Sequence, residues 1–214
     1  MTNTMQNQTQ SYPQYDDFAR QYGYVFPEAM FGLCFEYLQP GQRLLDIGIG
    51  TGLSTLPFTR VGIEGYGIDN SLEMLNMCRA KNIAVELKHV DITVKPWAFP
   101  DSYFDHVIAC GVLHFIPELE TIFQEVARVV HPKGIFAFTV KAPLAVTNEG
   151  GNPSRSMTEM IEGVQIYSHF STYYEELSSS YGFEMRKRLK FLLPRGVVDQ
   201  DDLYVACIAQ KLSG

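Results

Sequence analysis

Apolar and polar residues along this chain fall into blocks that switch between strand-like runs and helix-like stripes. Short apolar runs predict five strands, at residues 43–47, 65–68, 84–89, 105–110 and 135–141. Between these runs, apolar residues recur at helical spacing and predict helices at residues 53–60, 71–81 and 118–130. Strands that alternate with helices are typical of an α/β fold with a mainly parallel sheet.

Apolar residues in the N-terminal part of the chain also recur at helical spacing, and prolines mark where the helices begin and end. Apolar positions over residues 14–38 predict helical structure, with Pro27 placed to open a second helix and Pro40 to end it. Farther along, Asn70 and Glu73 are expected to form a box-like cap for the helix at 71–81.

The C-terminal part begins with a break in the alternation. Residues 142–170 carry Pro, Gly and Asn at short intervals, so little regular structure is expected there. Thr172 and Glu175 are expected to cap the next helix, at 173–181. Two strands follow, at residues 183–190 and 203–209, and their connection has no helix, which predicts an antiparallel pair.

Together these elements predict a Rossmann-like α/β fold, a doubly wound, seven-stranded, mainly parallel sheet with an antiparallel C-terminal edge pair. The 214 residues are enough to bury one core, so a single domain is expected. Its expected parts are a disordered tail at 1–12, a helical cover at 13–39 and a binding core at 40–141. An insertion follows at 142–170, and the C-terminal helix with the strand pair occupies 171–214.

The charge balance argues against nucleic acid as a partner. Lysine and arginine number 17 against 24 acidic residues, a formal net charge of −7 that repels phosphate backbones. The dense basic cluster, Arg186, Lys187, Arg188 and Lys190, is interpreted as the solvated face of a strand, with a patch for an anionic ligand as the alternative.

The cysteines and the apolar runs indicate a reducing, non-membrane location. Cys34, Cys78, Cys110 and Cys207 lie far apart without metal-ligand spacing, so neither a metal site nor a disulfide framework is expected. The first residues are polar and do not form a secretory signal, and no apolar run is long enough to cross a bilayer. A cytoplasmic protein is expected.

The strongest chemical signal is the segment Asp46-Ile47-Gly48-Ile49-Gly50-Thr51-Gly52, where a strand runs into alternate glycines. Glycines permit a tight turn and close approach of a ligand, and the helix beyond offers free N–H groups. A dinucleotide fingerprint requires a small residue at position 53, where this chain has Leu53, and it has no counterpart to Asp46. A small-molecule site is therefore predicted at this strand end, and dinucleotide binding is disfavoured.

This D-x-G-x-G-x-G segment resembles motif I of the class I S-adenosylmethionine-dependent methyltransferases, and the chain is similar to the small-molecule, UbiE-like members. Four further segments resemble later motifs of that family in the same order: Gly67-Ile68-Asp69-Asn70-Ser71, Val90-Asp91-Ile92, Phe104-Asp105-His106-Val107-Ile108 and the turn from Arg128 to Ile135. The resemblance covers residues 40–141 closely and the C-terminal strands loosely.

The resemblance implies S-adenosyl-L-methionine as the cofactor and assigns it a set of residues. Asp46 would order the loop and help to bind the methionyl end, and Asp69, beside Asn70, would take the ribose hydroxyls. The remaining expected cofactor-binding residues are Gly48, Gly50 and Gly52 in the loop, Asp91 and Ile92 at the adenine, Cys110 and Gly111 at the sulfonium, and Tyr15 and Tyr22 over the sulfonium.

Several of these residues also have ordinary structural interpretations. Asp69 can be only a helix cap, and Asp91 can be only a turn former because aspartate bonds its own backbone. Cys110 is interpreted as a small core residue rather than as a reactive thiol. Simple hydrophobic packing is the alternative for Tyr15 and Tyr22.

The acceptor is expected over the loops after the fourth and fifth strands. His114 is the candidate catalytic residue, as a general base or as a hydrogen-bonding wall residue. Lys141, Tyr167 and His169 are the further candidates for the substrate side, with a local capping role as the alternative for His169.

The resemblance thus implies methyl transfer from S-adenosylmethionine to a small-molecule acceptor, by a monomer or a homodimer. Two alternatives stay open at this point: a dinucleotide-dependent oxidoreductase, and a non-catalytic protein that binds the methyl donor as a sensor or partner.

Overall fold

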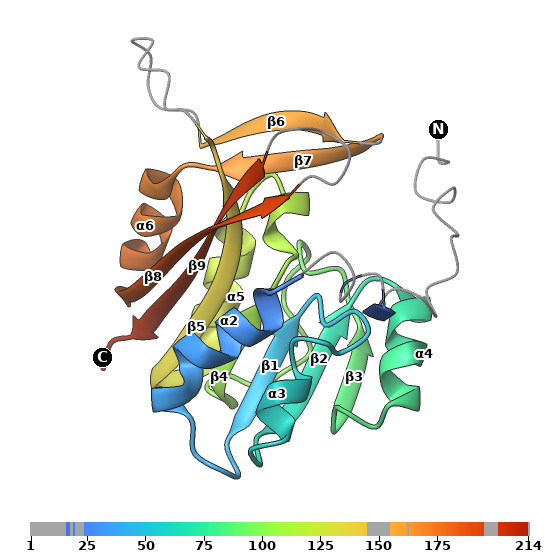
Figure 1. Cartoon of the computed structure of the whole chain (residues 1–214). Coiled ribbons are helices and arrows are strands. Elements are labelled where there is room, and N and C mark those ends of the chain that lie inside the picture. The colour runs from blue at the N-terminus through green and yellow to red at the C-terminus, as the bar shows by residue number, and fades with distance from the viewer. Residues whose placement is uncertain are drawn as a thin grey trace.

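A seven-stranded sheet forms the centre of the molecule (Figure 1). The computed structural model describes residues 16–17, 19, 24–144, 155–161, 163–194 and 201–213. The strand order is β3-β2-β1-β4-β5-β9-β8. The strands are β1 (Arg43–Ile47), β2 (Glu64–Asp69), β3 (Glu86–His89), β4 (Phe104–Ala109), β5 (Val130–Ala142), β8 (Phe183–Pro194) and β9 (Asp201–Lys211).

The pairing confirms the predicted topology. β1 to β5 pair in parallel, whereas β9 pairs antiparallel with both β5 and β8. The first strands run outward from β1 to β3, and the chain then crosses to β4 on the other side of β1. Open α/β sheets bind ligands in the crevice at such a switch point, outside the carboxyl ends of the strands.

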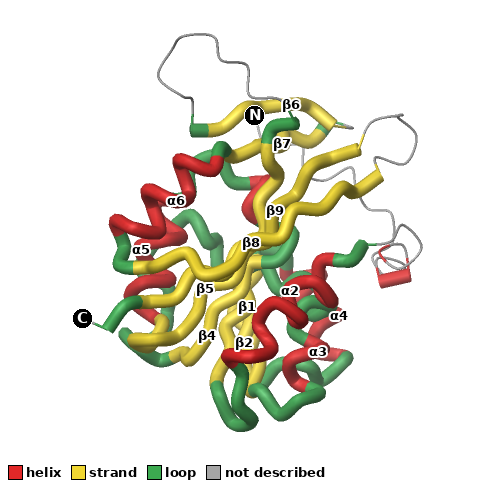
Figure 2. The backbone as a smooth tube through the Cα atoms, turned by 60° about the vertical axis from the view of Figure 1, so that its left-hand side comes forward, coloured by secondary structure: helices red, strands yellow, loops and turns green. Residues whose placement is uncertain are grey.

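Helices cover both faces of the sheet (Figure 2). One face carries α2 (Phe26–Cys34), α3 (Leu56–Thr59) and α4 (Leu72–Ala80), and the other carries α5 (Glu120–Val129) and α6 (Ser171–Ser180). There are also two short 3-10 turns, η2 (Phe35–Tyr37) and η3 (Leu113–Phe115), and residues 16, 17 and 19 are helical as well. Within the described residues, no helix has the length and apolar character needed to cross a bilayer.

The hydrophobic core is divided by the sheet into two main layers. Under α5 and α6, aromatic side chains of β5 such as Phe136 and Phe138 pack on Phe123, and all three are fully buried. Under α2, the core joins Phe26 and Met30 to the opposite face of the sheet. The apolar stripe predicted for α5 is therefore confirmed as its buried face, because helical spacing places those residues on one side.

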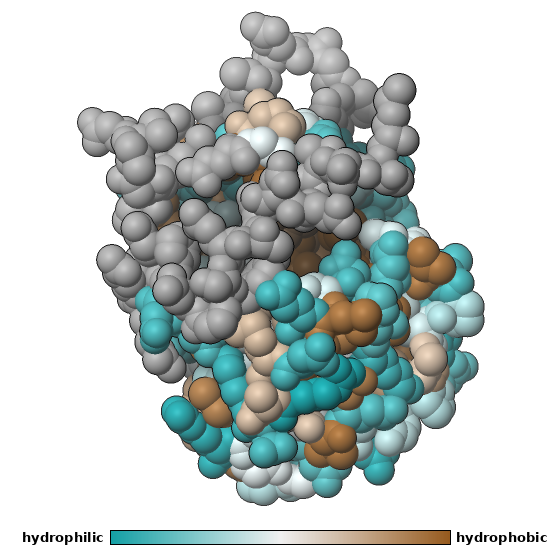
Figure 3. All heavy atoms as spheres, turned by 90° about the vertical axis from the view of Figure 1, so that its right-hand side faces the viewer, coloured by the Kyte–Doolittle hydropathy of each residue, from teal (hydrophilic) through white to brown (hydrophobic). Residues whose placement is uncertain are grey.

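The surface is largely polar. Figure 3 shows one face, on which hydrophobic side chains form separate patches among polar ones. The basic cluster on β8 is solvated and paired: Arg186 lies 2.9 Å from Glu184, Arg188 lies 2.9 Å from Glu175, and Lys187 pairs with Glu36. These pairs confirm the interpretation of the cluster as a strand face and leave little positive charge for an anionic ligand.

The structure corrects two predicted helix caps. Ser71, not Asn70, caps α4, because its hydroxyl accepts a hydrogen bond from the Met74 N–H at 3.3 Å. The box predicted at Thr172 and Glu175 is also wrong: α6 begins at Ser171 after Phe170, and no side chain caps it. Neighbouring polar residues compete for the cap position, and backbone direction decides between them.

The expectation of little regular structure at 142–170 is wrong for part of that segment. A separate two-stranded antiparallel sheet, β6 (Ser156–Ile161) and β7 (Val164–His169), turns at Gly163, whose φ is +82°. The hairpin has few fully buried positions, so its sequence lacks the apolar run that marks the central strands. Residues 145–154 of the insertion and the predicted tail at 1–12 lie outside the described residues.

Candidate functional site

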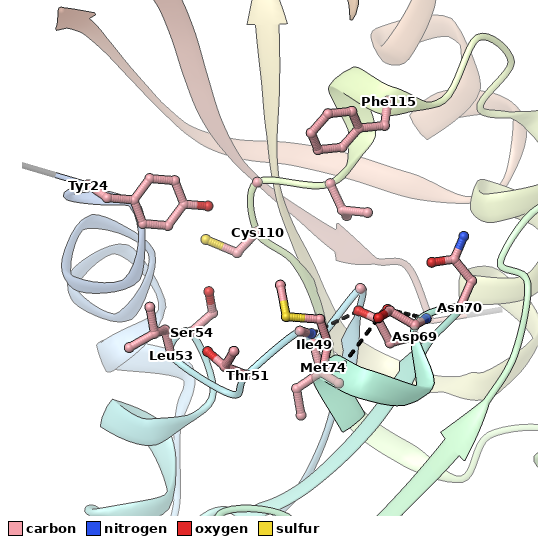
Figure 4. Close-up of a pocket in the computed structure, with 15 residues that line it drawn as sticks. Tyr24, Ile49, Thr51, Leu53, Ser54, Asp69, Asn70, Met74, Cys110 and Phe115 are labelled. Atoms are coloured by element: carbon pink, nitrogen blue, oxygen red, sulfur yellow. Dashed lines mark hydrogen bonds between the residues drawn. The ribbon is translucent and has the colours of Figure 1, made fainter. Parts of the chain in front are cut away.

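A cavity of about 240 Å³ opens at the carboxyl ends of β1, β2 and β4. Its walls come from segments 48–51, 53–54, 69–71 and 110–112, together with Tyr24, Met74 and Phe115. In Figure 4, Tyr24 and Phe115 lie on one side of this space, and Asp69 and Met74 lie on the other. The structure thus brings together the glycine loop, the acid after β2 and the residues after β4, as predicted.

The three glycines of the loop have different surroundings. All three have positive φ, +69° at Gly48, +53° at Gly50 and +88° at Gly52, a region that residues with a β-carbon rarely adopt. A β-carbon on Gly50 would stand in open space at the cavity, with no other atom nearer than 4.0 Å. Gly50 therefore leaves room for a ligand.

Gly48 and Gly52 instead permit close packing of the protein on itself. A β-carbon on Gly48 would lie 2.6 Å from Val112, and one on Gly52 would lie 2.9 Å from the Cys78 sulfur. Gly48 lines the cavity and Gly52 does not. In the structure, the lack of a side chain at Gly52 lets the loop approach α4. A contact between Gly52 and a cofactor stays a prediction.

Asp69 ties the end of β2 to the glycine loop. Its Oδ2 accepts a hydrogen bond from the Gly50 N–H at 2.8 Å, and its Oδ1 accepts one from the Ser71 N–H at 2.8 Å. A carboxylate has about four lone-pair sites, so these two bonds leave acceptor capacity at the cavity wall. Asn70, beside it, also lines the cavity.

Asp46 lies beneath the loop and not in the cavity wall. Its side chain is 1% exposed, and its Oδ2 accepts a hydrogen bond from the Thr55 hydroxyl at 2.7 Å. Its Oδ1 has no partner among the described residues. Burial raises the pKa of this carboxyl to about 8, the Thr55 hydrogen bond opposes that change, and the charge of Asp69 adds to it. Asp46 thus bonds Thr55 beneath the loop, and its expected roles in ordering the loop and in contacting a ligand stay predictions.

Cys110 and Gly111 border the cavity at the end of β4. Burial raises the pKa of the Cys110 thiol far above its ordinary value, so the group is a neutral thiol and a wall residue. Gly111 has a φ of +74°, and its N–H donates a hydrogen bond to the Thr139 hydroxyl at 2.7 Å. Both residues line the cavity, and their expected place beside the sulfonium stays a prediction.

Asp91 and Ile92 do not line the cavity. Asp91 Oδ1 accepts hydrogen bonds from the Thr93 hydroxyl at 2.6 Å and the Thr93 N–H at 2.9 Å, and these bonds lower the pKa of Asp91. Ile92 is buried, and its carbonyl accepts a bond from the Trp97 indole at 3.3 Å. The turn-forming interpretation of Asp91 describes these contacts, and the role of both residues at an adenine stays a prediction.

His114 lies behind the cavity wall, although its neighbour Phe115 lines the cavity. The imidazole is 8% exposed and packs 4.1 Å from the Phe115 ring and 5.7 Å from Tyr204, between ring centroids. Burial, and then the charge of Lys141, lowers the pKa of His114 to about 4, so the ring is neutral at pH 7. Its Nδ1 has no partner among the described residues.

The other predicted acceptor residues gather on the far side of η3 from the cavity. Lys141 is 3% exposed and forms ion pairs with Glu159 of β6 and with Asp202 of β9, the latter at 2.9 Å. The imidazole of His169 is fully buried, and its Nε2 lies 3.1 Å from the carbonyl oxygen of Leu113. That contact fits the local structural role named as the alternative for His169.

The described cavity does not test the predicted roles of three tyrosines. Tyr167 lies on β7 and does not line it, and Tyr15 and Tyr22 lie outside the described residues. The roles predicted for these three tyrosines stay predictions.

The cavity also contains residues that the sequence alone did not single out. They are Tyr24, Thr51, Leu53, Ser54, Met74, Val112 and Phe115. A usable signal existed for most of them, because they directly follow or flank the motif residues. Tyr24 and Met74 had no such signal. Tyr24 lies just before α2 and Met74 lies on α4, so only the folding of the chain brings them to the site.

Comparison with known proteins agrees with this geometry. Residues 45–138 match the family described as a methyltransferase domain, and they run from β1 into β5. A phosphatidylethanolamine N-methyltransferase of Cereibacter sphaeroides is 38% identical over 98 residues, which are 44% of this chain and 48% of that protein. Over residues 45–138, this chain is therefore similar to methyltransferase domains.

Two further proteins that are similar to this chain carry other names. A fatty-acid O-methyltransferase of Mycolicibacterium smegmatis is 32% identical over 105 residues, 48% of this chain and 38% of that protein. The crystal structure of a Burkholderia thailandensis 1,6-didemethyltoxoflavin-N1-methyltransferase has the same fold, with a TM-score of 0.65 at 16% identity, and covers 92% of this chain and 87% of that one. The chain spans less than half the length of the curated relatives it matches.

Proposed function

We propose that this protein transfers a methyl group from S-adenosylmethionine to a small-molecule acceptor. The observation that carries the proposal is the hydrogen bond from the Gly50 N–H to Asp69, which joins an open glycine and an acid in one cavity wall. A carboxylate beside a bare glycine backbone in a cavity wall suits a ligand that carries hydroxyl donors and approaches the backbone closely.

The described residues fit each part of such a donor. Asp69 offers acceptor oxygens for ribose hydroxyls, and the open space at Gly50 admits a ligand close to the backbone. Asp46 lies below the loop and has a buried oxygen that no described residue bonds, and an approaching ammonium would favour its charged form. The ring of Tyr24 supplies the aromatic face that favours a cation, a role that the sequence assigned to other tyrosines.

The chain contributes alignment and exclusion of water. When bound, S-adenosylmethionine supplies a methyl group on a sulfonium, which leaves as a neutral sulfide. Val112, Phe115 and Cys110 present largely apolar atoms to the cavity and exclude water from the reacting centre. With a pKa of about 4, His114 is a weak base at neutral pH, so we assign it to support the Phe115 wall in preference to proton abstraction.

We propose that the methyl acceptor is a small organic molecule. The named relatives act on a phospholipid amine, a fatty-acid oxygen and a ring nitrogen, so the family admits different acceptor atoms. Phe115 is 46% exposed and lines the cavity, and we propose that the acceptor enters beside it. Four buried free thiols support the proposed cytoplasmic location, and the net charge of −7 argues against nucleic acid.

Calorimetric titration tests the proposal. S-adenosylhomocysteine should bind in the micromolar range and NADH should not, whereas the reverse result would establish the dinucleotide alternative. A screen of small-molecule acceptors with S-adenosylmethionine should then produce S-adenosylhomocysteine. Donor binding without turnover on any acceptor class would favour the non-catalytic sensor.

A further inference from the structure

A side chain of β5 holds the point at which the chain leaves β4. The two strands pair in parallel as far as Ala109 and Phe138. Two residues farther on, the Gly111 N–H donates a hydrogen bond to the Thr139 hydroxyl at 2.7 Å. A backbone N–H that leaves a strand ladder inside the protein needs another acceptor, and Thr139 supplies it.

Thr139 does not need its hydroxyl for packing. The residue is 1% exposed and lies on the same face of β5 as Ile135 and Ala137, which are fully buried in the core under α2. Valine has nearly the same shape and would fill this space without a polar atom. Burial of a hydroxyl is unfavourable unless it is hydrogen-bonded, so the bond to Gly111 explains why a hydroxyl stands here.

The residues around Gly111 form part of the cavity wall. Cys110, Gly111 and Val112 all line the cavity. Thr139 does not, so any effect of its hydroxyl on a ligand passes through Gly111. Val112 packs against the bare backbone of Gly48, where a β-carbon would lie 2.6 Å from it. A shift of Gly111 would therefore move Val112 from this close contact and change the separation of the two loops that bound the cavity.

The conformation of Gly111 depends on contacts from outside the loop. Its φ is +74°, and glycine can adopt many other backbone conformations, so its surroundings must select this one. The Tyr24 hydroxyl occupies the space that a β-carbon on Gly111 would need, and Figure 4 shows the Tyr24 ring beside Cys110. Tyr24 thus restricts Gly111 sterically, and Thr139 provides a hydrogen bond to its backbone.

We propose that Thr139 is a positioning residue whose hydroxyl fixes Gly111 and, through it, sets the separation of the glycine loop and the loop after β4. A misplacement of about 1 Å can slow a reaction about 100-fold, so the position of this wall matters for methyl transfer. The identity of the donor rests on the proposed function, but the contact between Thr139 and Gly111 is present without a ligand.

Calorimetric titration with S-adenosylhomocysteine tests this role in the full chain. Thr139→Val leaves the Gly111 N–H without its acceptor and should raise the dissociation constant about 5- to 20-fold, the effect of losing one buried hydrogen bond. Thr139→Ser keeps a hydroxyl that can accept the bond and should restore wild-type affinity. Wild-type affinity in Thr139→Val, or equal weakening in both variants, would overturn the proposal.

Alkylation of the cysteines by N-ethylmaleimide tests the loop without a ligand. Cys110 directly follows β4, whereas Cys34, Cys78 and Cys207 are fully buried elsewhere in the core. In Thr139→Val, Cys110 should react about 10-fold faster than in the wild type while the other three stay protected, because the opening is local. Unchanged labelling of Cys110 would show that the loop does not move. Faster labelling of all four thiols together would show a general loss of packing, and either result would contradict the proposal.

Ser178→Ala is the matched control, because it also removes a buried hydroxyl that is hydrogen-bonded to the backbone. The Ser178 hydroxyl donates to the Tyr174 carbonyl at 2.7 Å on α6, which covers the other face of the sheet (Figure 2). This variant should bind S-adenosylhomocysteine and label at Cys110 like the wild type. Faster labelling of Cys110 in Ser178→Ala would show that loss of any buried hydroxyl opens the loop, and the specific role of Thr139 would be rejected.

Hydrogen exchange of the unliganded wild type gives a result that does not depend on whether the variants fold. The Gly111 amide lies beyond the paired part of β4, yet it should exchange as slowly as the amide of Ala109 within that strand. Rapid exchange at Gly111 would refute the proposal. Slow exchange at Gly111 and selective labelling of Cys110 in a chain that binds no S-adenosylhomocysteine would support the role of Thr139 and reject the donor.

Discussion

The hydroxyl group of Tyr24 lies 1.9 Å from the position that a β-carbon on Gly111 would occupy. The backbone of Gly111 has a φ of +74°, so glycine is needed there both for conformation and for space. The Tyr24 ring also packs edge-on against Phe26, 4.6 Å away between centroids, and so links the cavity to the core under α2. A single glycine thus lets Tyr24, just before α2, pack against the loop after β4.

Gly111→Ala should lower the free energy of unfolding by about 1 kcal/mol for the backbone, and by more because Tyr24 must move. Tyr24→Phe removes the obstructing hydroxyl. In that background, Gly111→Ala should lower the free energy of unfolding only by the backbone contribution. Urea denaturation of the four proteins measures both costs. An equal loss in the two backgrounds would show that Tyr24 is not the obstacle.

A comparison of Gly50→Ala with Gly52→Ala should distinguish a glycine that leaves room for a ligand from one that permits close packing within the protein. Gly50→Ala should cost about 1 kcal/mol of stability but greatly weaken S-adenosylhomocysteine binding, because its methyl group enters the cavity. Gly52→Ala should cost about 2 to 4 kcal/mol, because the methyl group meets Cys78 and Ile83 on strained backbone. Denaturation and calorimetry on both variants check the contrast, and similar behaviour of the two would contradict it.

Asp69→Ala should weaken S-adenosylhomocysteine binding by about 1 to 3 kcal/mol, the range for hydrogen bonds to a charged group. Part of that loss comes through Gly50, whose N–H loses its acceptor. Glu73→Ala, on the exposed first turn of α4, is the matched control and should bind normally. Unchanged affinity in Asp69→Ala would remove this acid from the donor site.

Asp46 should make the unliganded protein less stable as the pH rises. Its folded pKa of about 8 lies above the unfolded value of 3.8, so the stability from its protonated form is complete below about pH 4 and is lost as pH rises through 8. Between pH 6.5 and 8.5, where the buried histidines are already neutral, the free energy of unfolding should fall in the wild type. Asp46→Asn should flatten that slope in urea titrations. An equal slope in both proteins would assign the effect to other groups.

His114→Ala should leave S-adenosylhomocysteine affinity nearly unchanged, because the imidazole does not line the cavity. Turnover should fall, because Phe115 loses the ring that packs against it at 4.1 Å. With a pKa of about 4, His114 should produce no step in the rate between pH 6 and 8. A wild-type step near pH 6.5 that disappears in His114→Ala would instead support the general base.

Much of the site was predictable because its chemistry lies in short contiguous segments. Asp46, the glycines and Asp69 sit at the ends of apolar runs, and parallel strands bring their carboxyl ends to one edge of a sheet. Lys141 was predicted on the acceptor side because it ends the fifth strand, and His169 because it follows the irregular insertion. The structure shows their partners in β6, β9 and η3, where the hairpin at 156–169 lies, and their roles toward an acceptor stay predictions.

By itself, the sequence determined the alternation of strands and helices, the loop that begins the site and the acid that faces it, since local periodicity and glycine spacing encode these features directly. Only the tertiary structure decided which side chains reach the cavity. Tyr24 closes on Gly111, Asp16 meets Lys81 across the glycine loop, and His114 turns behind Phe115. Such pairings depend on how distant elements pack, and the period of a helix or strand carries no information about them.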